Sequence, residues 1–315
     1  MKKTMIAIAM LMSIASSQSW AGGQFDFGKF ADKINDVKKI AEPAKKIIDA
    51  IRDFSEEEEL GIGQEMASNL LGAAPLYANE PAQRYVNLVG HVLAANTERA
   101  GLEWHFAVID DMELNAFAAP GGYVFISKGL LLSMRNEAEL AGVLSHEIAH
   151  VLKRHQLVAI KNNARTALGA DFVAGMVEKK SGVSSNGQLS PLFHQLALIG
   201  TKLFVSKLDQ EDELEADRMG IVIAARAGYN PFGLPSVLQA LQSVKPDHTG
   251  VALMFKTHPP FDLRLEKLSQ LMTQAFEQLD NQPDLADRFK ATLTPPAPAP
   301  EPASASKLPA KKKTK

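Results

Sequence analysis

The sequence contains no cysteine among its 315 residues, so neither a disulfide framework nor a cysteine-ligated metal is possible. Any metal site must therefore use histidine, aspartate or glutamate. Neither sign of charge dominates, because 34 Lys and Arg stand against 36 Asp and Glu, and this balance does not favour a nucleic-acid partner. The hydrophobic share of 46% is ample for a core, which excludes a chain that is disordered throughout.

Long apolar runs are also lacking, and the short one at the amino terminus predicts a signal peptide. Lys2 and Lys3 precede an apolar run, and Ser19-Trp20-Ala21 forms a small-x-small cleavage site. We expect residues 1–21 to be cleaved, which predicts a periplasmic mature chain with no transmembrane span. An uncleaved anchor is the alternative, but the run is shorter than the ~20 residues that a span requires.

The remaining chain divides into three parts. Residues 22–55 carry apolar side chains at helical spacing, which predicts an amphipathic segment packed on the domain surface or, alternatively, lying on a membrane. Residues 56–290 are expected to fold, with helices from 56 to about 71 and from 81 to about 96, strands at 104–109 and 123–127, and mostly helix after 129. Residues 291–315 are rich in Pro, Ala and Lys, which predicts a disordered tail.

The strongest chemical signal is the motif from His146 to His150, which reads HEIAH. Asn136 followed by Glu139 indicates a helix start, and apolar residues then recur at helical spacing. The two histidines are four residues apart on this helix, so both imidazoles can bind one metal, and Glu147 is placed to hold a water beside it. Two core histidines bonded to backbone are the alternative interpretation.

A third ligand must come from elsewhere. The metzincin pattern requires Gly and His where this chain has Lys153 and Gln156, so that class is excluded. His155 is one residue out of place, and we expect it to be exposed on the following turn. The acidic run 209–217 opens another helix, on which Glu213 and Asp217 share one face. One can bind metal while the other accepts a hydrogen bond from a ligand histidine; a solvated helix face is the alternative.

Four stretches in the same order resemble a known family. They are the HEIAH motif, the segment 213–217, the segment 115–126, and Thr257-His258-Pro259-Pro260 with Arg264. Over about residues 56–271 the chain resembles the HEXXH zinc metallopeptidases that include BepA, LoiP, HtpX and the CAAX prenyl endopeptidase. The resemblance implies a zincin-like (gluzincin) α+β fold, mostly helical, with a small sheet beside the HEXXH helix. Without a spanning helix, the chain is similar to the soluble periplasmic branch.

The resemblance also implies roles for individual residues. One Zn²⁺ per chain would be held by His146, His150 and Glu213, with Glu213 rather than Glu215 as the third ligand. Glu147 would act as general base, and Asp217 would orient a ligand histidine. His258 would either stabilise the oxyanion or cover the zinc. The substrate would add as a strand along Asn115, Ala116, Phe117 and Ala118.

These features predict a zinc-dependent endopeptidase that cleaves proteins or unfolded polypeptides in the periplasm, in envelope protein quality control. Peripheral contact with the outer membrane or its assembly machinery is compatible with this prediction. A chaperone-like or scaffold protein with a latent, mainly structural metal site is the alternative, although such a site has no use for Glu147 as a base. An aminopeptidase is disfavoured because no segment for binding a free amino terminus is present.

Overall fold

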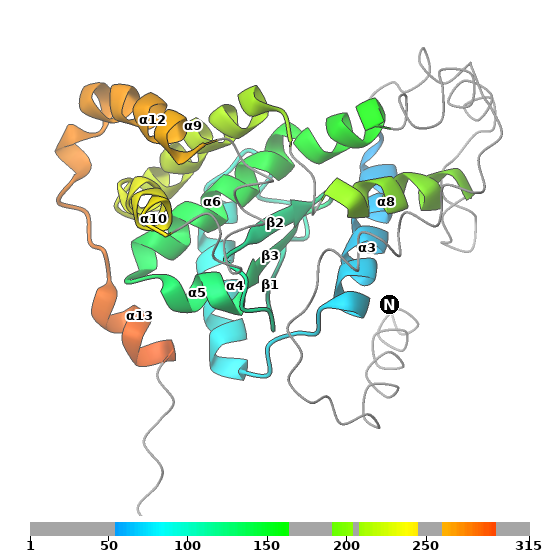
Figure 1. Ribbon diagram of the computed structural model, residues 1–315, viewed down its shortest axis with the longest axis horizontal. Helices are drawn as coiled ribbons and strands as arrows, with labels where there is room; N and C mark the ends of the chain where they lie inside the picture. The colour runs from blue at the N-terminus through cyan, green and yellow to red at the C-terminus, as the bar shows by residue number, and fades with distance from the viewer. Residues whose placement is uncertain (1–53, 164–190, 204–207, 245–259, 294–315) are drawn as a thin grey trace, which may run out of the picture.

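The computed structural model describes residues 54–163, 191–203, 208–244 and 260–293 (Figure 1). The predicted signal peptide, nearly all of the segment 22–55, His258 and most of the tail lie outside the described residues. The helices are α3 (Glu56–Ala73), α4 (Glu80–Ala95), α5 (Lys128–Ser133), α6 (Glu137–Lys153), α8 (Pro191–Leu203), α9 (Gln210–Arg226), α10 (Gly233–Gln242), α12 (Phe261–Ala275), the short 3-10 helix η3 (Glu277–Leu279) and α13 (Ala286–Leu293). The strands are β1 (His105–Ile109), β2 (Ala116–Ala119) and β3 (Tyr123–Ser127).

Local capping residues set where the helices begin. Ser55 and Glu58 form a reciprocal capping box at the start of α3, which confirms the predicted helix start. At the start of α6, the Asn136 side chain accepts a hydrogen bond from the Glu139 N–H, as predicted. The Glu139 carboxylate instead bonds Arg135, through its backbone N–H and its guanidinium, so this second box is only half formed.

The three strands form one small sheet with the order β1-β3-β2. β1 pairs with β3 in parallel, and β2 pairs with β3 antiparallel. The β2–β3 hairpin turns at Gly121 and Gly122, whose φ angles of 77° and 93° lie in the left-handed region that glycine tolerates best. Glu59 of α3 accepts a hydrogen bond from the Gly121 N–H at 3.2 Å, which ties this turn to the first helix.

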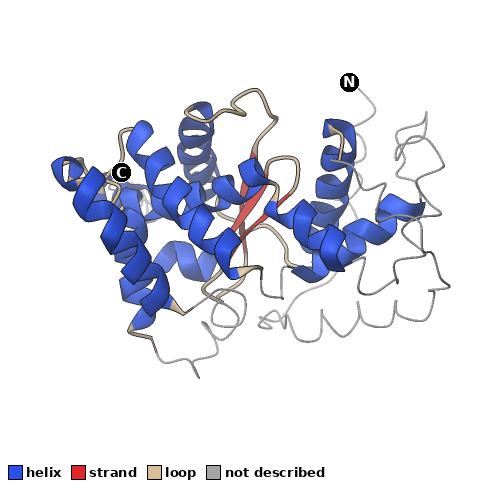
Figure 2. Cartoon of the chain, turned by 90° about the horizontal axis from the view of Figure 1, so that it is seen from above, coloured by secondary structure: helices blue, strands red, loops and turns tan. Residues whose placement is uncertain are grey.

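Both faces of the sheet are buried, with alternate residues on opposite sides. Phe106, Val108 and Val124 belong to the larger core, which contains residues of α4, α6, α9, α10, α12 and α13. Ile109 and Phe125 belong to a second core with residues of α3 and α8. Figures 1 and 2 show helices on both sides of the strands, and the predicted mostly helical α+β fold with a small sheet is confirmed.

Helix α9 packs closely along α6, and this contact positions the functional site. Gly220 makes the approach possible, because a Cβ atom there would lie 3.0 Å from the His146 backbone nitrogen and 3.1 Å from its Cα. α10 approaches α6 as closely, since a Cβ on Gly142 would lie 2.5 Å from the Leu234 nitrogen. α6 is therefore clamped between two helices that reach its backbone.

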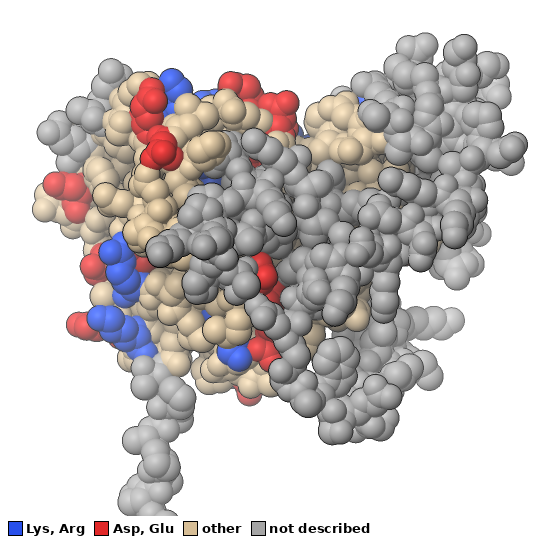
Figure 3. Space-filling model, viewed as in Figure 1, with Lys and Arg blue, Asp and Glu red and all other residues tan. Residues whose placement is uncertain are grey.

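The described surface carries charges of both signs. On the face shown in Figure 3, acidic and basic side chains are interspersed where the described residues are visible. None of the helices in the described ranges is both long and apolar enough to cross a membrane.

Candidate functional site

Two packed helices bring three possible metal ligands together. α6 contributes His146 and His150, and α9 contributes Glu213. The two imidazole Nε2 atoms are 3.1 Å apart. Carboxylate oxygens of Glu213 lie 3.6 Å from His146 Nε2 and 3.5 Å from His150 Nε2, and all three side chains are buried. Within the described ranges, no other group of three side chains could hold a metal ion in this way.

The separations among these donor atoms fit a four-coordinate zinc ion. Ligand atoms about 2.0–2.1 Å from a tetrahedral zinc lie roughly 3.3–3.4 Å from one another. The distances of 3.1, 3.5 and 3.6 Å between the side chains fall on either side of that value, with one Glu213 oxygen nearer to each histidine. Two imidazoles and one carboxylate are also a ligand set of catalytic zinc sites that keep a fourth position open. The residues present therefore fit the metal that the motif predicts.

The second ring nitrogen of His146 faces a buried carboxylate. His146 Nδ1 lies 3.0 Å from Asp217 Oδ1, and Arg264 of α12 donates to both Asp217 oxygens, at 2.8 Å from Nε and 2.6 Å from Nη2. If Nδ1 donates to Asp217, Nε2 keeps its lone pair for a metal. Burial lowers the pKa of His146, which favours the neutral, metal-binding form. Burial raises the pKa of Asp217, but the charge and hydrogen bonds of Arg264, together with the contact to His146, outweigh burial and hold that pKa below its usual range.

Glu147 is buried next to the ligand cluster, and the pKa of its carboxyl group is strongly raised. Burial, followed by the negative charge of Glu213, raises the pKa of Glu147 to about 8. A carboxyl group with such a pKa can hold or release a proton near neutral pH, as a general acid–base catalyst must. A cation in the ligand cluster would favour the carboxylate and lower this pKa, so the cluster and Glu147 are electrostatically coupled.

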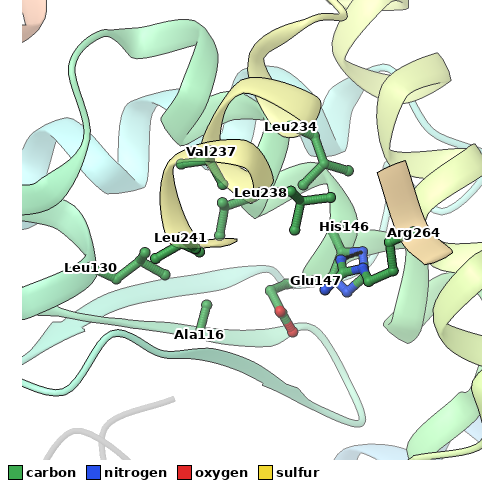
Figure 4. A pocket seen from close by; sticks show the side chains of 10 residues that line it. Ala116, Leu130, His146, Glu147, Leu234, Val237, Leu238, Leu241 and Arg264 are labelled. Atoms are coloured by element: carbon green, nitrogen blue, oxygen red, sulfur yellow. Dashed lines mark hydrogen bonds between the residues drawn. The ribbon is translucent and has the colours of Figure 1, made fainter. Parts of the chain in front are cut away.

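An apolar cavity opens beside Glu147. In Figure 4, His146, Glu147 and Arg264 lie together at one end of the cavity, whereas Leu130 and Leu241 lie at the other. The rest of the wall is aliphatic and comes from β2, α6 and α10: Ala116, Val143, Leu234, Val237 and Leu238. The carboxyl group of Glu147 therefore lies next to a mostly apolar space.

The predicted substrate-binding segment borders this cavity. Asn115 directly precedes β2, and Ala116, Phe117 and Ala118 form most of that strand. β2 is at an edge of the described sheet, pairing with β3, and all four residues are buried. Because Ala116 lines the cavity, the edge strand and the Glu147 carboxyl group lie on the same site. That a substrate pairs with this strand remains a prediction.

The expectation that His155 is exposed is wrong. Only 4% of His155 is exposed, and its Nδ1 lies 2.9 Å from His150 Nδ1. The helical segment 155–163 starts in a new direction because Arg154, the C-cap of α6, adopts a left-handed conformation with φ of 58°. This reversal turns His155 inward, onto the ligand helix. His155 Nε2 lies 3.2 Å from Glu215 Oε2, so Glu215 also belongs to the surroundings of the cluster.

Arg264 also belongs to the surroundings of the cluster, and its burial could have been inferred from the sequence. It lies three residues after Phe261 and four before Leu268, on the buried stripe of α12. A charged side chain at an apolar position of an amphipathic helix needs a buried partner of opposite charge. The identity of that partner, Asp217, depends on the tertiary fold. His258 lies outside the described residues, and its role remains a prediction.

Comparisons with known proteins agree with this geometry. The sequence profile described as Peptidase family M48 matches residues 80–272. The beta-barrel assembly-enhancing protease of Escherichia coli (strain K12) is 32% identical over 220 residues, which cover 65% of this chain and 43% of the relative. The same-named protein of Yersinia pestis is 31% identical over 220 residues, which cover 67% of this chain and 43% of the relative.

A third relative has a different name. The mitochondrial metalloendopeptidase OMA1 of Schizosaccharomyces pombe is 29% identical over 232 residues, which cover 73% of this chain and 65% of the relative. The chain thus spans less than half the length of the beta-barrel assembly-enhancing proteases that it matches.

Proposed function

Because the chain belongs to peptidase family M48, we propose that it is a zinc-dependent endopeptidase that cleaves envelope proteins in the periplasm. The family and the relatives named as metalloendopeptidases confirm the predicted enzyme class and the predicted family resemblance. The observation that supports the full proposal is the convergence of His146, His150 and Glu213 beside the carboxyl group of Glu147, at the wall of a cavity.

In the proposed reaction, Glu147 takes a proton from the attacking water and later delivers it to the leaving amine. Zinc, when bound by His146, His150 and Glu213, would supply a Lewis acid that activates water and polarises the scissile carbonyl. Asp217 and Arg264 would hold the His146 ring, so that its Nε2 stays directed at the metal. The apolar wall of the cavity would take a substrate side chain and exclude water from the reacting groups.

The proposed substrates are proteins or unfolded polypeptides of the envelope. Two of the relatives are named for enhancing beta-barrel assembly, and the amino-terminal residues of this chain predict export. We extend the relatives' role to this chain only as envelope protein quality control. Backbone pairing along Asn115, Ala116, Phe117 and Ala118 would make recognition tolerant of sequence, since an edge strand reads main-chain groups.

The decisive experiment compares zinc content and casein cleavage of wild type with Glu147→Gln. The amide retains the size of the side chain but cannot accept the proton, so cleavage should fall about 10²–10⁴-fold with about one zinc per chain retained. Glu57→Gln, an exposed change on α3, is the matched control and should behave as wild type. Near-normal cleavage by Glu147→Gln contradicts the mechanism. Zinc binding without cleavage by wild type supports the scaffold alternative.

A further inference from the structure

We propose that His155 and Glu215 are positioning residues that hold the His150 imidazole in its metal-binding orientation. The inference rests on the proposed function, because it concerns the same zinc site. It is based on a row of three side chains in contact, His150, His155 and Glu215. The row starts at the ligand cluster and ends at the partly exposed Glu215 carboxylate.

The contacts allow one consistent assignment of protons. If His150 Nε2 binds the metal, its Nδ1 carries a hydrogen and donates it to His155 Nδ1 at 2.9 Å. His155 then carries its own hydrogen on Nε2 and donates it to Glu215 Oε2 at 3.2 Å. The two rings meet at 74° with centroids 5.0 Å apart, an edge-on arrangement that is compatible with a hydrogen bond between ring nitrogens.

The Glu215 end of this row of side chains is held in place by an ion pair. Lys153 Nζ lies 2.5 Å from Glu215 Oε1, which leaves Oε2 for His155. Asp212 adds a second carboxylate 3.6 Å from His155 Nε2, so the nitrogen assigned as donor faces acidic groups. Metal-binding histidines usually donate their second ring hydrogen to a carboxylate or a carbonyl. Here a second histidine carries that interaction to the carboxylate.

The backbone is bent to place His155 there. A left-handed conformation is uncommon for a residue other than glycine, and Arg154 adopts it directly before His155. Arg154 is held in place because its Nη2 lies 3.0 Å from Glu59 Oε2 and its Nη1 donates to the Phe54 carbonyl at 3.2 Å. The strained turn brings His155 back onto His150, five residues earlier, instead of outward as a continued helix would.

The two ligand histidines therefore have separate supports. Asp217 and Arg264 face His146, whereas His155 faces His150 and is in turn bonded to Glu215. Loss of the second support should loosen metal binding without removing a ligand. Mutation of such outer partners typically lowers metal affinity about 10–100-fold.

The test measures zinc affinity by competition with a chromogenic chelator, using the purified full chain. His155→Phe retains ring volume but no hydrogen-bonding atoms, and its affinity should fall about 10–100-fold. His155→Asn, which can still accept from His150, should recover most of the loss. Gln156→Leu is the matched control, because Gln156 is the next residue and is similarly buried, at 5% exposure. The unfolding midpoint of each zinc-free variant reports general damage.

The outcomes separate the inference from the proposed function. Wild-type zinc affinity in His155→Phe, or an equal loss in Gln156→Leu, overturns the positioning role. If His155→Phe does not fold, Glu215→Ala takes its place, because 35% of that side chain is exposed and its removal should be tolerated. Unchanged zinc affinity in Glu215→Ala then overturns the inference. Failure of wild type to bind zinc or cleave casein instead counts against the proposed function itself.

Discussion

Removal of the positive charge on Arg264 should destabilise the domain more than the loss of a surface ion pair would. Arg264 is 3% exposed and makes two hydrogen bonds to Asp217, at 2.8 and 2.6 Å. Arg264→Met retains much of the side-chain volume and leaves the buried Asp217 carboxylate against the His146 ring, without the guanidinium charge. Breaking a buried ion pair from one side typically costs about 3–5 kcal/mol, because the remaining charge is uncompensated.

That free energy converts into a large thermal shift. For a domain of this size, each kcal/mol lowers Tm by roughly 2–4 °C, so a total shift of roughly 6–20 °C is expected. The assay is thermal unfolding of the zinc-free protein, followed by circular dichroism, so that metal affinity does not enter. Arg84→Met is the matched control, because Arg84 pairs with Glu80 on the surface and should contribute less than about 1 kcal/mol.

A double variant tests the electrostatic reason for the loss. In Arg264→Met with Asp217→Asn, the uncompensated charge is gone, so the double variant should be more stable than Arg264→Met alone. If Arg264→Met lowers stability no more than Arg84→Met does, the pair is not the structural element that we describe. If the double variant is less stable than the single one, the loss comes from packing and not from the buried charge.

Three further changes test other parts of the structure. Burial raises the pKa of Glu137, but hydrogen bonds from Arg288 and two tyrosines together outweigh burial, so the pKa is lowered. The ionised Glu137 therefore contributes to folding stability above about pH 4.3, and this contribution is lost on acidification. Arg288→Gln should therefore flatten the acid side of a denaturation midpoint–pH profile; an unchanged profile refutes this. Gly220→Ala should push α9 off His146, lowering stability by about 1–3 kcal/mol in urea unfolding together with zinc affinity; unchanged values contradict that contact. Leu238→Trp should fill the cavity and reduce casein cleavage at unchanged zinc content, whereas normal cleavage would place substrate elsewhere.

The helix starts were predictable because capping is local. Ser55 needs only a residue three positions later to complete its box, and the sequence contains it. The second box shows the limit of this reasoning: Glu139 is in the right place for Asn136 but bonds Arg135 instead. The competing hydrogen bonds come from the backbone N–H and the guanidinium of Arg135, the residue before Asn136. A rule based on the spacing of the cap residues does not consider them.

The buried charges were harder to predict than the ligands. His146 and His150 share a helix face by their spacing alone. Arg264 and Asp217 are 47 residues apart, and their pairing requires α12 to lie over α9. Similarly, the prediction that His155 is exposed is wrong because the left-handed Arg154, bound to Glu59, ends α6 directly before it and His155 contacts His150.

The sequence by itself determined the family, the mostly helical α+β class and the residue types of the candidate metal site. These depend on spacings within single helices, where 3.6 residues per turn fixes the helix face on which each side chain lies. Only the tertiary structure decided which carboxylate faces which histidine, that His155 turns inward, and that an apolar cavity adjoins Glu147. These arrangements depend on packing between helices distant in the chain, such as the approach of α9 at Gly220, and local periodicity carries no information about such contacts.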